Sequence, residues 1–344
     1  MSSGKIRVLI VDDSAIVRRA LSEIVGSHPD LEVAGTASDP FVARDKILSL
    51  KPDVLTLDIE MPRMDGLTFL KKLMRYHPLP VVVISSLGQS SSQAALEALH
   101  SGAVDVVAKP GGPYSVTELR DQLALKIRAA AGARLDRPPA AAEAPPRAES
   151  RRRGVSLIAI GASTGGVEAL RAVLAPLPAE MPPIVVVQHI PAVFSREFAR
   201  RLNDICKIRV KEASDGDAAE PGLALIAPGN FHMSLRGAPG AYRVAVHGGD
   251  PVLYQRPSVD VLFDSAAKIA GGQALGVILT GMGADGAAGM LRMKQAGART
   301  IAQNEATCVV FGMPREAIRI GAAEEILPLD RIGPELARYA LAAV

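Results

Sequence analysis

The sequence predicts an α/β protein made of two doubly wound parallel-sheet (α/β/α) domains, a flavodoxin-like one followed by a Rossmann-like one. Short runs of branched apolar residues alternate with amphipathic helical patterns, which is the element order of a parallel sheet with helical crossovers. The alternation occurs twice, in residues 1–128 and in residues 154–344. The segment between them, 129–153, is poor in large apolar residues. We therefore expect two domains joined by a linker.

The composition is that of a folded chain. Of the 344 residues, 48% are hydrophobic and 22% are charged, which is ample for two buried cores. The formal net charge is +3, and the surplus lies in residues 129–153, which carry six arginines and three acidic residues. A basic linker is not the basic face that nucleic-acid binding needs, and aromatic residues make up only 3% of the chain. We therefore expect no nucleic-acid partner.

Cysteine content and hydropathy indicate where the protein works. The two cysteines, Cys206 and Cys308, are too few for a disulfide framework and fit a reducing compartment. The sequence has no charged-then-apolar leader and no apolar run of about 18 residues. We therefore expect a cytoplasmic protein without membrane insertion, and we expect it to be a monomer.

In the first segment, four apolar runs each end in polar residues. Their composition is typical of buried parallel strands, and a helical pattern (Ile16, Ala20, Leu21, Ile24 and Val25) follows the first run. The carboxyl ends of such strands meet at one edge of the sheet, where ligands bind. The runs are Ile6–Val11 before Asp12 and Asp13, Val54–Leu57 before Asp58, Val81–Ile84 before Ser85, and Val104–Ala108 before Lys109.

The residues expected at this edge have a specific chemistry. Carboxylates gathered at one point repel one another unless a divalent cation neutralises them, so Asp12, Asp13 and Asp58 predict an Mg²⁺ site. Asp58 is then placed to accept a phosphoryl group, and Lys109 to pair with one of its oxygens. For any single aspartate, a helix cap or a solvated loop is the better interpretation. Their occurrence together at successive strand ends favours the site.

These residues resemble a response-regulator receiver domain. The resemblance rests on Asp12-Asp13, the segment DIEMPRMDG at 58–66, Ser85 and Lys109-Pro110. It implies that a partner histidine kinase phosphorylates Asp58.

The receiver resemblance also implies a ligand set and a switch. Mg²⁺ would be held by Asp12, Asp13, Asp58 and the backbone carbonyl of Glu60. Ser85 and Lys109 would follow the phosphate, and Ser85 would shift the loop after it. Val106 stands where the family commonly has an aromatic switch residue, so an aromatic readout is not expected.

Residues 129–153 read AAAGARLDRPPAAAEAPPRAESRRR, which is rich in Ala, Pro and Arg. Such a segment buries too little surface to offset the entropy of ordering, so we expect an extended or mobile linker. A hinge that lets the two domains separate and a passive tether are equally compatible with this composition.

The second segment is organised around VSLIAIGASTGG, residues 155–166. The apolar run Leu157–Ile160 predicts a buried strand, and a helical pattern begins after Gly165 and Gly166. A serine at such a turn, Ser163, has its hydroxyl beside free backbone N–H groups, which is how a nucleophile and its oxyanion site are built. The same stretch is compatible with a serine that only caps the helix, or with glycines that cradle a phosphate.

Two further apolar runs lead to residues that complete a catalytic set. Ile184–Gln188 leads to His189, and Ala274–Thr280 leads to a glycine-rich loop with Asp285. If these strands are parallel neighbours of the strand before Ser163, the serine, histidine and aspartate meet at one edge, as acyl transfer requires. The N–H of Met282, in the same loop, is a candidate oxyanion donor.

Simpler interpretations exist for each of these residues. His189 alone is more often a hydrogen-bonded loop residue, and Asp285 alone could cap the helical pattern at 286–293. Other histidines compete for the role of base, but none follows a strong buried-strand run, and no Cys/His spacing suggests zinc. Those histidines are His28, His77, His100, His232 and His247. The convergence of three strand ends favours the triad.

The second segment also resembles the catalytic domain of the CheB chemotaxis methylesterases. The motifs are GASTGG, QHIP around His189, RPSVDVLF at 256–263, TGMGADGAAGM and AQNEATCVVFGMPREAI. With the receiver resemblance, they cover nearly the whole chain. They imply hydrolysis of glutamyl methyl esters on chemoreceptor helices with release of methanol, accompanied by deamidation of receptor glutamines.

The CheB resemblance assigns a role to each site residue. Ser163 would be the nucleophile, His189 the base and Asp285 the residue that orients it, while Thr164, Gly165 and Met282 would lie near the oxyanion. No cofactor is implied for the esterase reaction.

Partners and regulation follow from the same resemblance. Methyl-accepting chemoreceptors would be the substrate and the chemotaxis histidine kinase CheA the phosphodonor. The unphosphorylated receiver domain would cover the active site, and phosphate on Asp58 would favour an open state. Gln255 stands where many members have histidine, so a substrate contact there is not expected.

Two other classes of function remain open. The second domain could be a binding module without enzyme activity whose release is controlled by phosphorylation. It could also bind a nucleotide through GASTGG, although no lysine follows the glycines as in a P-loop. A DNA-binding output is disfavoured because no basic recognition helix is visible.

Overall fold

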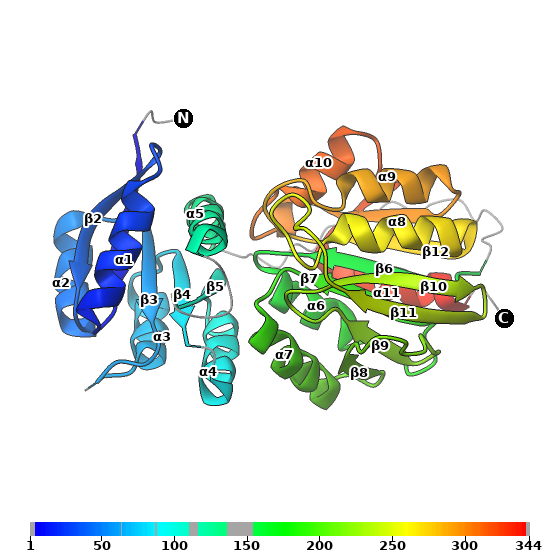
Figure 1. Cartoon of the computed structure of the whole chain (residues 1–344), viewed down its shortest axis with the longest axis horizontal. Coiled ribbons are helices and arrows are strands. Elements are labelled where there is room, and N and C mark those ends of the chain that lie inside the picture. The colour runs from blue at the N-terminus through cyan, green and yellow to red at the C-terminus, as the bar shows by residue number, and fades with distance from the viewer. Residues whose placement is uncertain (1–3, 63, 87, 110–115, 136–153, 342–344) are drawn as a thin grey trace. The chain divides into compact units, whose positions relative to one another are not determined.

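The computed structural model describes residues 4–62, 64–86, 88–109, 116–135 and 154–341. The chain divides at Leu135 into two compact units, and each is an α/β sandwich with a parallel sheet (Figure 1). The predicted fold class is therefore confirmed.

The first unit contains a five-stranded parallel sheet in the order β2-β1-β3-β4-β5. This is the flavodoxin-like strand order, in which the chain reverses direction beside β1 and leaves a crevice at the strands' carboxyl ends. The elements are β1 (Ile6–Val11), α1 (Ala15–Gly26), β2 (Leu31–Ala37), α2 (Pro40–Leu50), β3 (Val54–Asp58), α3 (Gly66–Tyr76), β4 (Val81–Ser85), α4 (Gln89–His100), β5 (Asp105–Ala108) and α5 (Val116–Ala131).

Side-chain caps fix where three helices of this unit begin. The side chains of Ser14, Asp39 and Asp65 accept hydrogen bonds from backbone N–H groups in the first turns of α1, α2 and α3. Each cap therefore fixes where the chain leaves the strand edge and turns into a helix.

Helix α1 departs from the predicted apolar face at one position. Leu21, Ile24 and Val25 are buried as the helical spacing indicates, but the side chain of Ile16 is 82% exposed. Ile16 lies in the first turn, at the loop end of the helix, where the sheet no longer covers it.

Helix α5 continues beyond the predicted domain end. It runs to Ala131, and the side chains of Ala129 and Ala130 are buried. The first three residues of the expected linker 129–153 are thus helical, because alanines can both propagate a helix and pack closely. Residues 136–153 of that segment lie outside the described residues.

The second unit contains a seven-stranded sheet in the order β14-β13-β12-β6-β7-β9-β8, with parallel pairing throughout. Its elements are β6 (Leu157–Ala162), α6 (Gly166–Leu174), β7 (Ile184–Gln188), α7 (Ala192–Ile205), β8 (Arg209–Glu212), β9 (Leu223–Ile226), β10 (His232–Ala238), β11 (Ala241–His247), α8 (Val259–Ile269), β12 (Ala274–Ile278), α9 (Ala287–Gln295), β13 (Arg299–Gln303), α10 (Met313–Arg319), β14 (Glu325–Leu327) and α11 (Leu329–Leu341).

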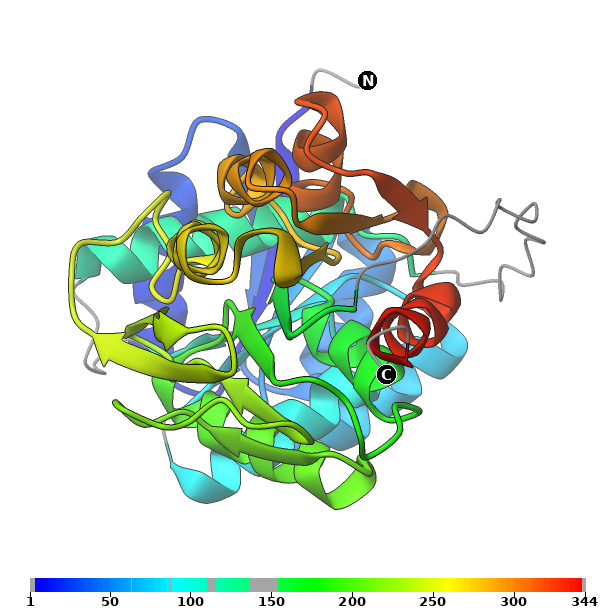
Figure 2. The ribbon, with the colours of Figure 1, turned by 90° about the vertical axis from the view of Figure 1, so that its right-hand side faces the viewer.

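Helices cover both faces of this sheet. Helices α8, α9 and α10 lie on one face, and α6, α7 and α11 lie on the other, as the two ribbon views show (Figures 1 and 2). The antiparallel hairpin β10–β11 packs against α8. Strands β12, β6 and β7 at the centre of the sheet are buried along their whole lengths. They therefore hold the loops at their carboxyl ends on a rigid base.

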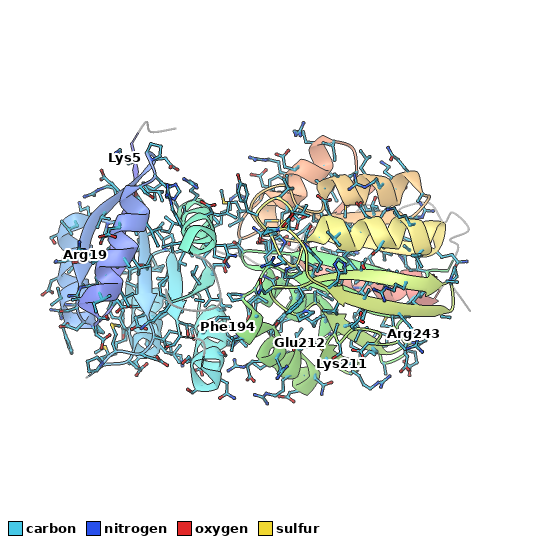
Figure 3. All side chains as sticks on the ribbon, viewed as in Figure 1. Lys5, Arg19, Phe194, Lys211, Glu212 and Arg243 are labelled. Atoms are coloured by element: carbon cyan, nitrogen blue, oxygen red, sulfur yellow. The ribbon has the colours of Figure 1, made fainter. Side chains whose placement is uncertain are left out.

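Strand β8 is an exposed edge of the seven-stranded sheet. Its charged residues include Lys211 and Glu212 (Figure 3), while Val210 between the exposed positions is buried. Charged side chains on an edge strand oppose pairing with another chain.

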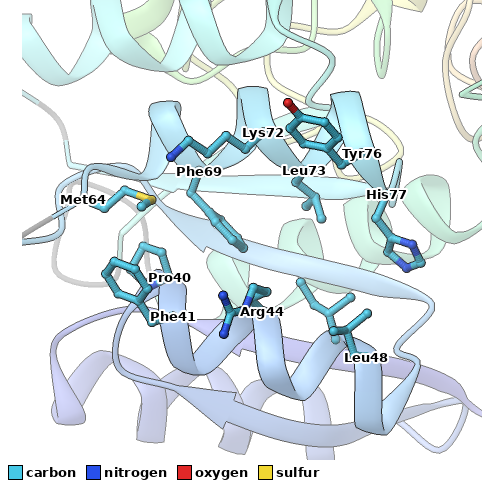
Figure 4. A pocket seen from close by; sticks show the side chains of 11 residues that line it. Pro40, Phe41, Arg44, Leu48, Met64, Phe69, Lys72, Leu73, Tyr76 and His77 are labelled. Carbon is cyan, nitrogen blue, oxygen red and sulfur yellow. The ribbon is translucent and has the colours of Figure 1, made fainter.

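A cavity of about 300 Å³ opens between α2 and α3 of the first unit (Figure 4). Apolar side chains such as Phe41, Leu48 and Phe69 line it, with Lys72 and Arg44 among its polar residues. None of the residues predicted for a functional site lines this cavity. No helix in the described part of the chain is both long enough and apolar enough to span a membrane.

Candidate active site

The carboxyl edge of the first sheet brings three aspartates together. Carboxylate oxygens of Asp12, Asp13 and Asp58 all lie within 4.8 Å of one another. Asp12 and Asp58 are buried, and Asp13 is exposed. Among the described residues, Oδ2 of Asp12 has no hydrogen-bond partner although it is buried. A buried carboxylate oxygen without a partner beside two further carboxylates fits a hard divalent cation.

Lys109 supplies the positive charge at this edge. Its Nζ donates a hydrogen bond of 2.7 Å to Oδ2 of Asp58 and lies 3.6 Å from Oδ2 of Asp12. Burial raises the pKa of Asp58 to about 6, and the hydrogen bond from Lys109 only partly offsets this. Burial also raises the pKa of Asp12. The cluster is therefore electrostatically costly without a further cation, which is the physical reason for its affinity for one.

The other predicted receiver residues lie around this cluster. Ser85 ends β4, and its hydroxyl is 3.3 Å from the carbonyl oxygens of both Ser86 and Ser91. The carboxylate of Glu60 accepts hydrogen bonds from the hydroxyls of Ser86, which precedes α4, and Ser91, which lies in the first turn of α4. The Glu60 N–H donates to Oδ1 of Asp58 at 3.1 Å. Pro110 lies outside the described residues, and Val106 is buried in β5.

In the second unit, Ser163 and His189 follow two adjacent strands. Strands β6 and β7 pair in a register that sets Ala162 opposite Gln188, and the His189 N–H donates to the Ala162 carbonyl at 3.1 Å. Ser163 and His189 are the next residues on each strand, so they lie side by side at the carboxyl edge. Both are nearly buried, with 8% and 6% of their surfaces exposed.

Asp285 meets His189 from the loop after β12. Its Oδ2 lies 2.8 Å from Nε2 of His189, and both side chains are buried. Among the described residues, Nδ1 of His189 has no hydrogen-bond partner. Because a carboxylate only accepts, Nε2 carries the proton and Nδ1 is left with a free lone pair.

Asp285 also binds the start of α8. Its Oδ1 accepts hydrogen bonds from the Ser258 hydroxyl at 2.7 Å and the Asp260 N–H at 3.0 Å, and its Oδ2 accepts from the Val259 N–H at 2.7 Å. Burial alone would raise the pKa of Asp285, but the hydrogen bonds from His189 and from these N–H groups hold it below its ordinary value. The carboxylate is therefore ionised at neutral pH.

The loop after β12 packs directly against Ser163. The Ser163 N–H donates to the Thr280 carbonyl at 3.0 Å. A Cβ atom on Gly281 would lie 2.7 Å from Cβ of Ser163, so only glycine lets the two segments approach this closely. Met282 follows in this loop, and its N–H makes no hydrogen bond within the part of the chain that the structure describes.

The turn after Ser163 is held by further buried contacts. The Gln188 side-chain amide donates to the Ser163 carbonyl at 2.8 Å, and the Thr280 hydroxyl donates to the Thr164 carbonyl at 3.0 Å. Gly165 adopts the left-handed conformation, with φ of 77°. These contacts fix the backbone on both sides of the serine hydroxyl.

Comparisons with known proteins identify relatives of both units. A family model described as CheB methylesterase matches residues 158–336, and one described as response regulator receiver domain matches residues 8–121. Protein-glutamate methylesterase/protein-glutamine glutaminase 2 of Syntrophus aciditrophicus is 58% identical over 340 residues, which are 97% of this chain and 99% of the relative. The chain belongs to the CheB methylesterase family.

Two further relatives of this CheB-family chain are informative. The protein-glutamate methylesterase/protein-glutamine glutaminase of Salmonella typhimurium is 55% identical over 336 residues, 97% of this chain and 96% of the relative. The crystal structure of the Thermotoga maritima CheB methylesterase catalytic domain matches with 40% identity and a TM-score of 0.52, covering 54% of this chain and 98% of that chain. The predicted family and enzyme class, a methylesterase joined to a receiver domain, are confirmed.

For this CheB-family chain, the structure decides between interpretations of the two site loops. The N-cap of α6 is Gly165, without a side-chain hydrogen bond, so Ser163 is not a helix cap. Likewise Gly286 is the N-cap of α9, so Asp285 does not cap the helix that follows it. Asp285 binds the start of α8 instead.

Sequence reasoning missed the role of Ser258, and the structure agrees with the exclusion of His232 as the base. Ser258 caps α8, which a serine directly before the apolar pattern Val259–Phe263 could have indicated. His232 is buried, where it accepts from the Ser258 N–H through Nδ1 at 3.2 Å and donates to the Asp250 carbonyl through Nε2 at 3.0 Å. Both of its nitrogens are used, so His232 supports the loop before α8 and is not available as a base.

Proposed function

We propose that this chain hydrolyses glutamyl methyl esters on methyl-accepting chemoreceptors and that phosphorylation of Asp58 controls the reaction. The observation that carries the proposal is the buried His189, which follows the strand adjacent to that of Ser163 and whose Nε2 is held by Asp285, while Nδ1 has no partner among the described residues. That arrangement leaves a lone pair where a serine proton can be accepted.

The chemistry follows from these atoms. Ser163 Oγ attacks the ester carbonyl as Nδ1 of His189 takes the hydroxyl proton, and that proton then leaves with methoxide as methanol. Water attacks the resulting acyl-enzyme as it gives a proton to His189, and His189 returns that proton to Ser163 Oγ as the free glutamate leaves. The ionised Asp285 fixes the tautomer and stabilises the imidazolium ion formed in both steps.

The developing oxyanion needs backbone donors. The free N–H of Met282 and the turn formed by Thr164 and Gly165 flank Ser163, which supports their assignment to the oxyanion site. The nucleophile, base and oxyanion donors all come from the chain, so the proposal includes no cofactor for the ester reaction. A glutamine side chain would react in the same way with ammonia as the leaving group, which accounts for deamidation.

The first unit would act as the switch. Asp12, Asp13 and Asp58, with the backbone carbonyl of Glu60, are the ligands proposed for Mg²⁺. When bound by these ligands, Mg²⁺ would supply positive charge to neutralise a phosphoryl group. Asp58 accepts that group from a histidine kinase, CheA, and Lys109 and Ser85 contact it.

The remaining assignments complete the proposal. We place the protein in the cytoplasm as a monomer, without nucleic-acid binding or membrane insertion. The receiver domain comprises residues 1–128, the expected linker lies between the units, and the catalytic domain begins at residue 154.

Replacement of the nucleophile tests the ester reaction. Ser163→Ala should lower methanol release from methylated receptor membranes by a thousandfold or more, on the order of that seen for triad knockouts. The thermal unfolding temperature should stay close to that of the wild type. Methanol release by the variant at a rate close to that of the wild type would rule out Ser163 as the nucleophile.

A further inference from the structure

The loop between β11 and α8 presents large apolar side chains to solvent. Leu253 is 53% exposed and Tyr254 is 70% exposed. Phe231, on the segment that is hydrogen-bonded to this loop, is 46% exposed. We call Phe231, Leu253 and Tyr254 the apolar surface. Because their side chains are largely exposed, packing within the fold does not explain why these positions carry large apolar residues.

The backbone conformation of Leu253 and Tyr254 is also unusual for large apolar residues. Val252 and Gln255 exchange two backbone hydrogen bonds of 3.0 and 2.9 Å and so close a two-residue turn. Leu253 and Tyr254 both have positive φ, 48° and 66°, for which such turns strongly favour Asn-Gly. Folding would thus be better served by small polar residues, and this strained display of apolar groups points to a function.

The turn is held rigidly from its base. The Arg256 guanidinium donates to Oδ1 of Asn230 at 3.0 and 2.6 Å and to the Gly249 carbonyl at 2.7 Å. The Asn230 N–H donates back to the Arg256 carbonyl at 3.1 Å. An apolar surface on a fixed backbone binds a partner without a large ordering cost.

The same loop leads directly into the active site. Ser258 follows Tyr254 by four residues, and its hydroxyl binds Asp285. Four residues of extended chain span at most about 14 Å, so Tyr254 lies within about that distance of Ser258.

We propose that the apolar surface docks the polypeptide that carries the ester, by contacting apolar side chains on an α-helix that flanks the modified glutamate. The inference rests on the proposed function, because a glutamyl methyl ester alone is too small to reach the turn. Contact with the flanking helix makes the enzyme select protein esters over small ones. A helix is the favoured occupant because it can present several apolar residues on one face.

A double variant, Leu253→Asn with Tyr254→Gly, separates docking from catalysis. It removes both apolar side chains and places the residues that the turn prefers, so the unfolding temperature should be unchanged or higher. We expect kcat/KM for methanol release from methylated receptor membranes to fall about tenfold. Hydrolysis of N-acetylglutamate γ-methyl ester, which cannot reach the turn, should be unchanged.

A matched control is Ile326→Asn, which removes an apolar side chain that is 50% exposed on the edge strand β14. It should leave both reactions unchanged. The docking role is overturned if the double variant keeps its kcat/KM on receptors, or if it loses both reactions equally, which would mean that the turn only positions Ser258. Increased activity of the unphosphorylated double variant on receptors would also overturn it, because the turn would then contact the receiver domain.

A different experimental result would show that the proposed esterase function, and not the docking role, is wrong. If the wild type releases no methanol from either ester, the esterase assignment fails. Co-sedimentation with receptor membranes then still decides the inference, because the wild type should bind them about tenfold more tightly than the double variant. Equal binding by the two proteins would overturn it.

Discussion

Nε2 of His189 lies 2.8 Å from Oδ2 of Asp285, and the same carboxylate binds the first turn of α8 through Ser258, Val259 and Asp260. The buried carboxylate of Asp285 thus connects His189, which follows β7, to the start of α8, which lies much later in the chain. Because these donors hold the pKa of Asp285 below its ordinary value of 3.8, the carboxylate stays ionised in the folded protein.

Asp285→Asn should lower kcat for methanol release by about 10⁴, because an amide no longer fixes the histidine tautomer. It should also lower the free energy of unfolding. A carboxylate with a depressed pKa stabilises the fold above its unfolded pKa, and this stabilisation is lost as the pH falls through the folded value. In urea unfolding, the difference in free energy of unfolding between the wild type and Asp285→Asn should therefore be largest near pH 7 and should become smaller below about pH 4. A gap that does not change with pH would contradict ionisation of Asp285.

Gly281→Ala should displace the nucleophile. The added Cβ would lie 2.7 Å from Cβ of Ser163 and would also collide with Sδ of Met313. A shift of about 1 Å in a reacting group costs about a hundredfold in rate, so kcat should fall by at least that factor. Gly248→Ala is the control, because no heavy atom lies within 4 Å of its added Cβ. Steady-state kinetics with normal activity for Gly281→Ala would contradict the close packing of Ser163.

Asp58→Asn should stabilise the first unit at neutral pH in the absence of divalent cations. Burial raises the pKa of Asp58 to about 6, so its protonated form stabilises the fold at low pH and this contribution is lost as the pH rises through 6. Calorimetry should show a higher unfolding temperature for the variant at pH 7.5, with the difference vanishing below about pH 4. Mg²⁺ should stabilise the wild type more than the variant. Equal stabilisation of both by Mg²⁺ would exclude Asp58 as a ligand.

Much of the fold was predictable because each parallel strand is a continuous apolar run. The runs Ile6–Val11 and Ile184–Gln188 coincide with β1 and β7, and the polar residue after each run marks the sheet edge. The candidate sites follow from these strand ends. The triad required that the three strands be parallel neighbours. Strand β6 does pair in parallel with both β7 and β12, and this pairing brings Ser163 and His189 together with the Asp285 loop.

The contacts that hold the site depend on tertiary packing and were not predictable. Asp285 binds α8, which begins 26 residues earlier in the chain, and no local pattern specifies that contact. His232 is a similar case, since its role depends on Asp250 and Ser258 lying on either side of it. The exposure of Ile16 was also not predictable from the helical pattern. Hydrophobic periodicity indicates which face of a helix is buried, but it does not indicate where along the helix the sheet ends.

The most direct test of the account is whether Asp58 controls the esterase. Methanol release from methylated receptor membranes would be measured for the wild type and for Asp58→Ala, each with and without acetyl phosphate and Mg²⁺. We predict that the phosphodonor raises the activity of the wild type and has no effect on Asp58→Ala, which keeps the basal rate. An equal response of the two proteins, or no response of the wild type, would contradict the coupling of the two units.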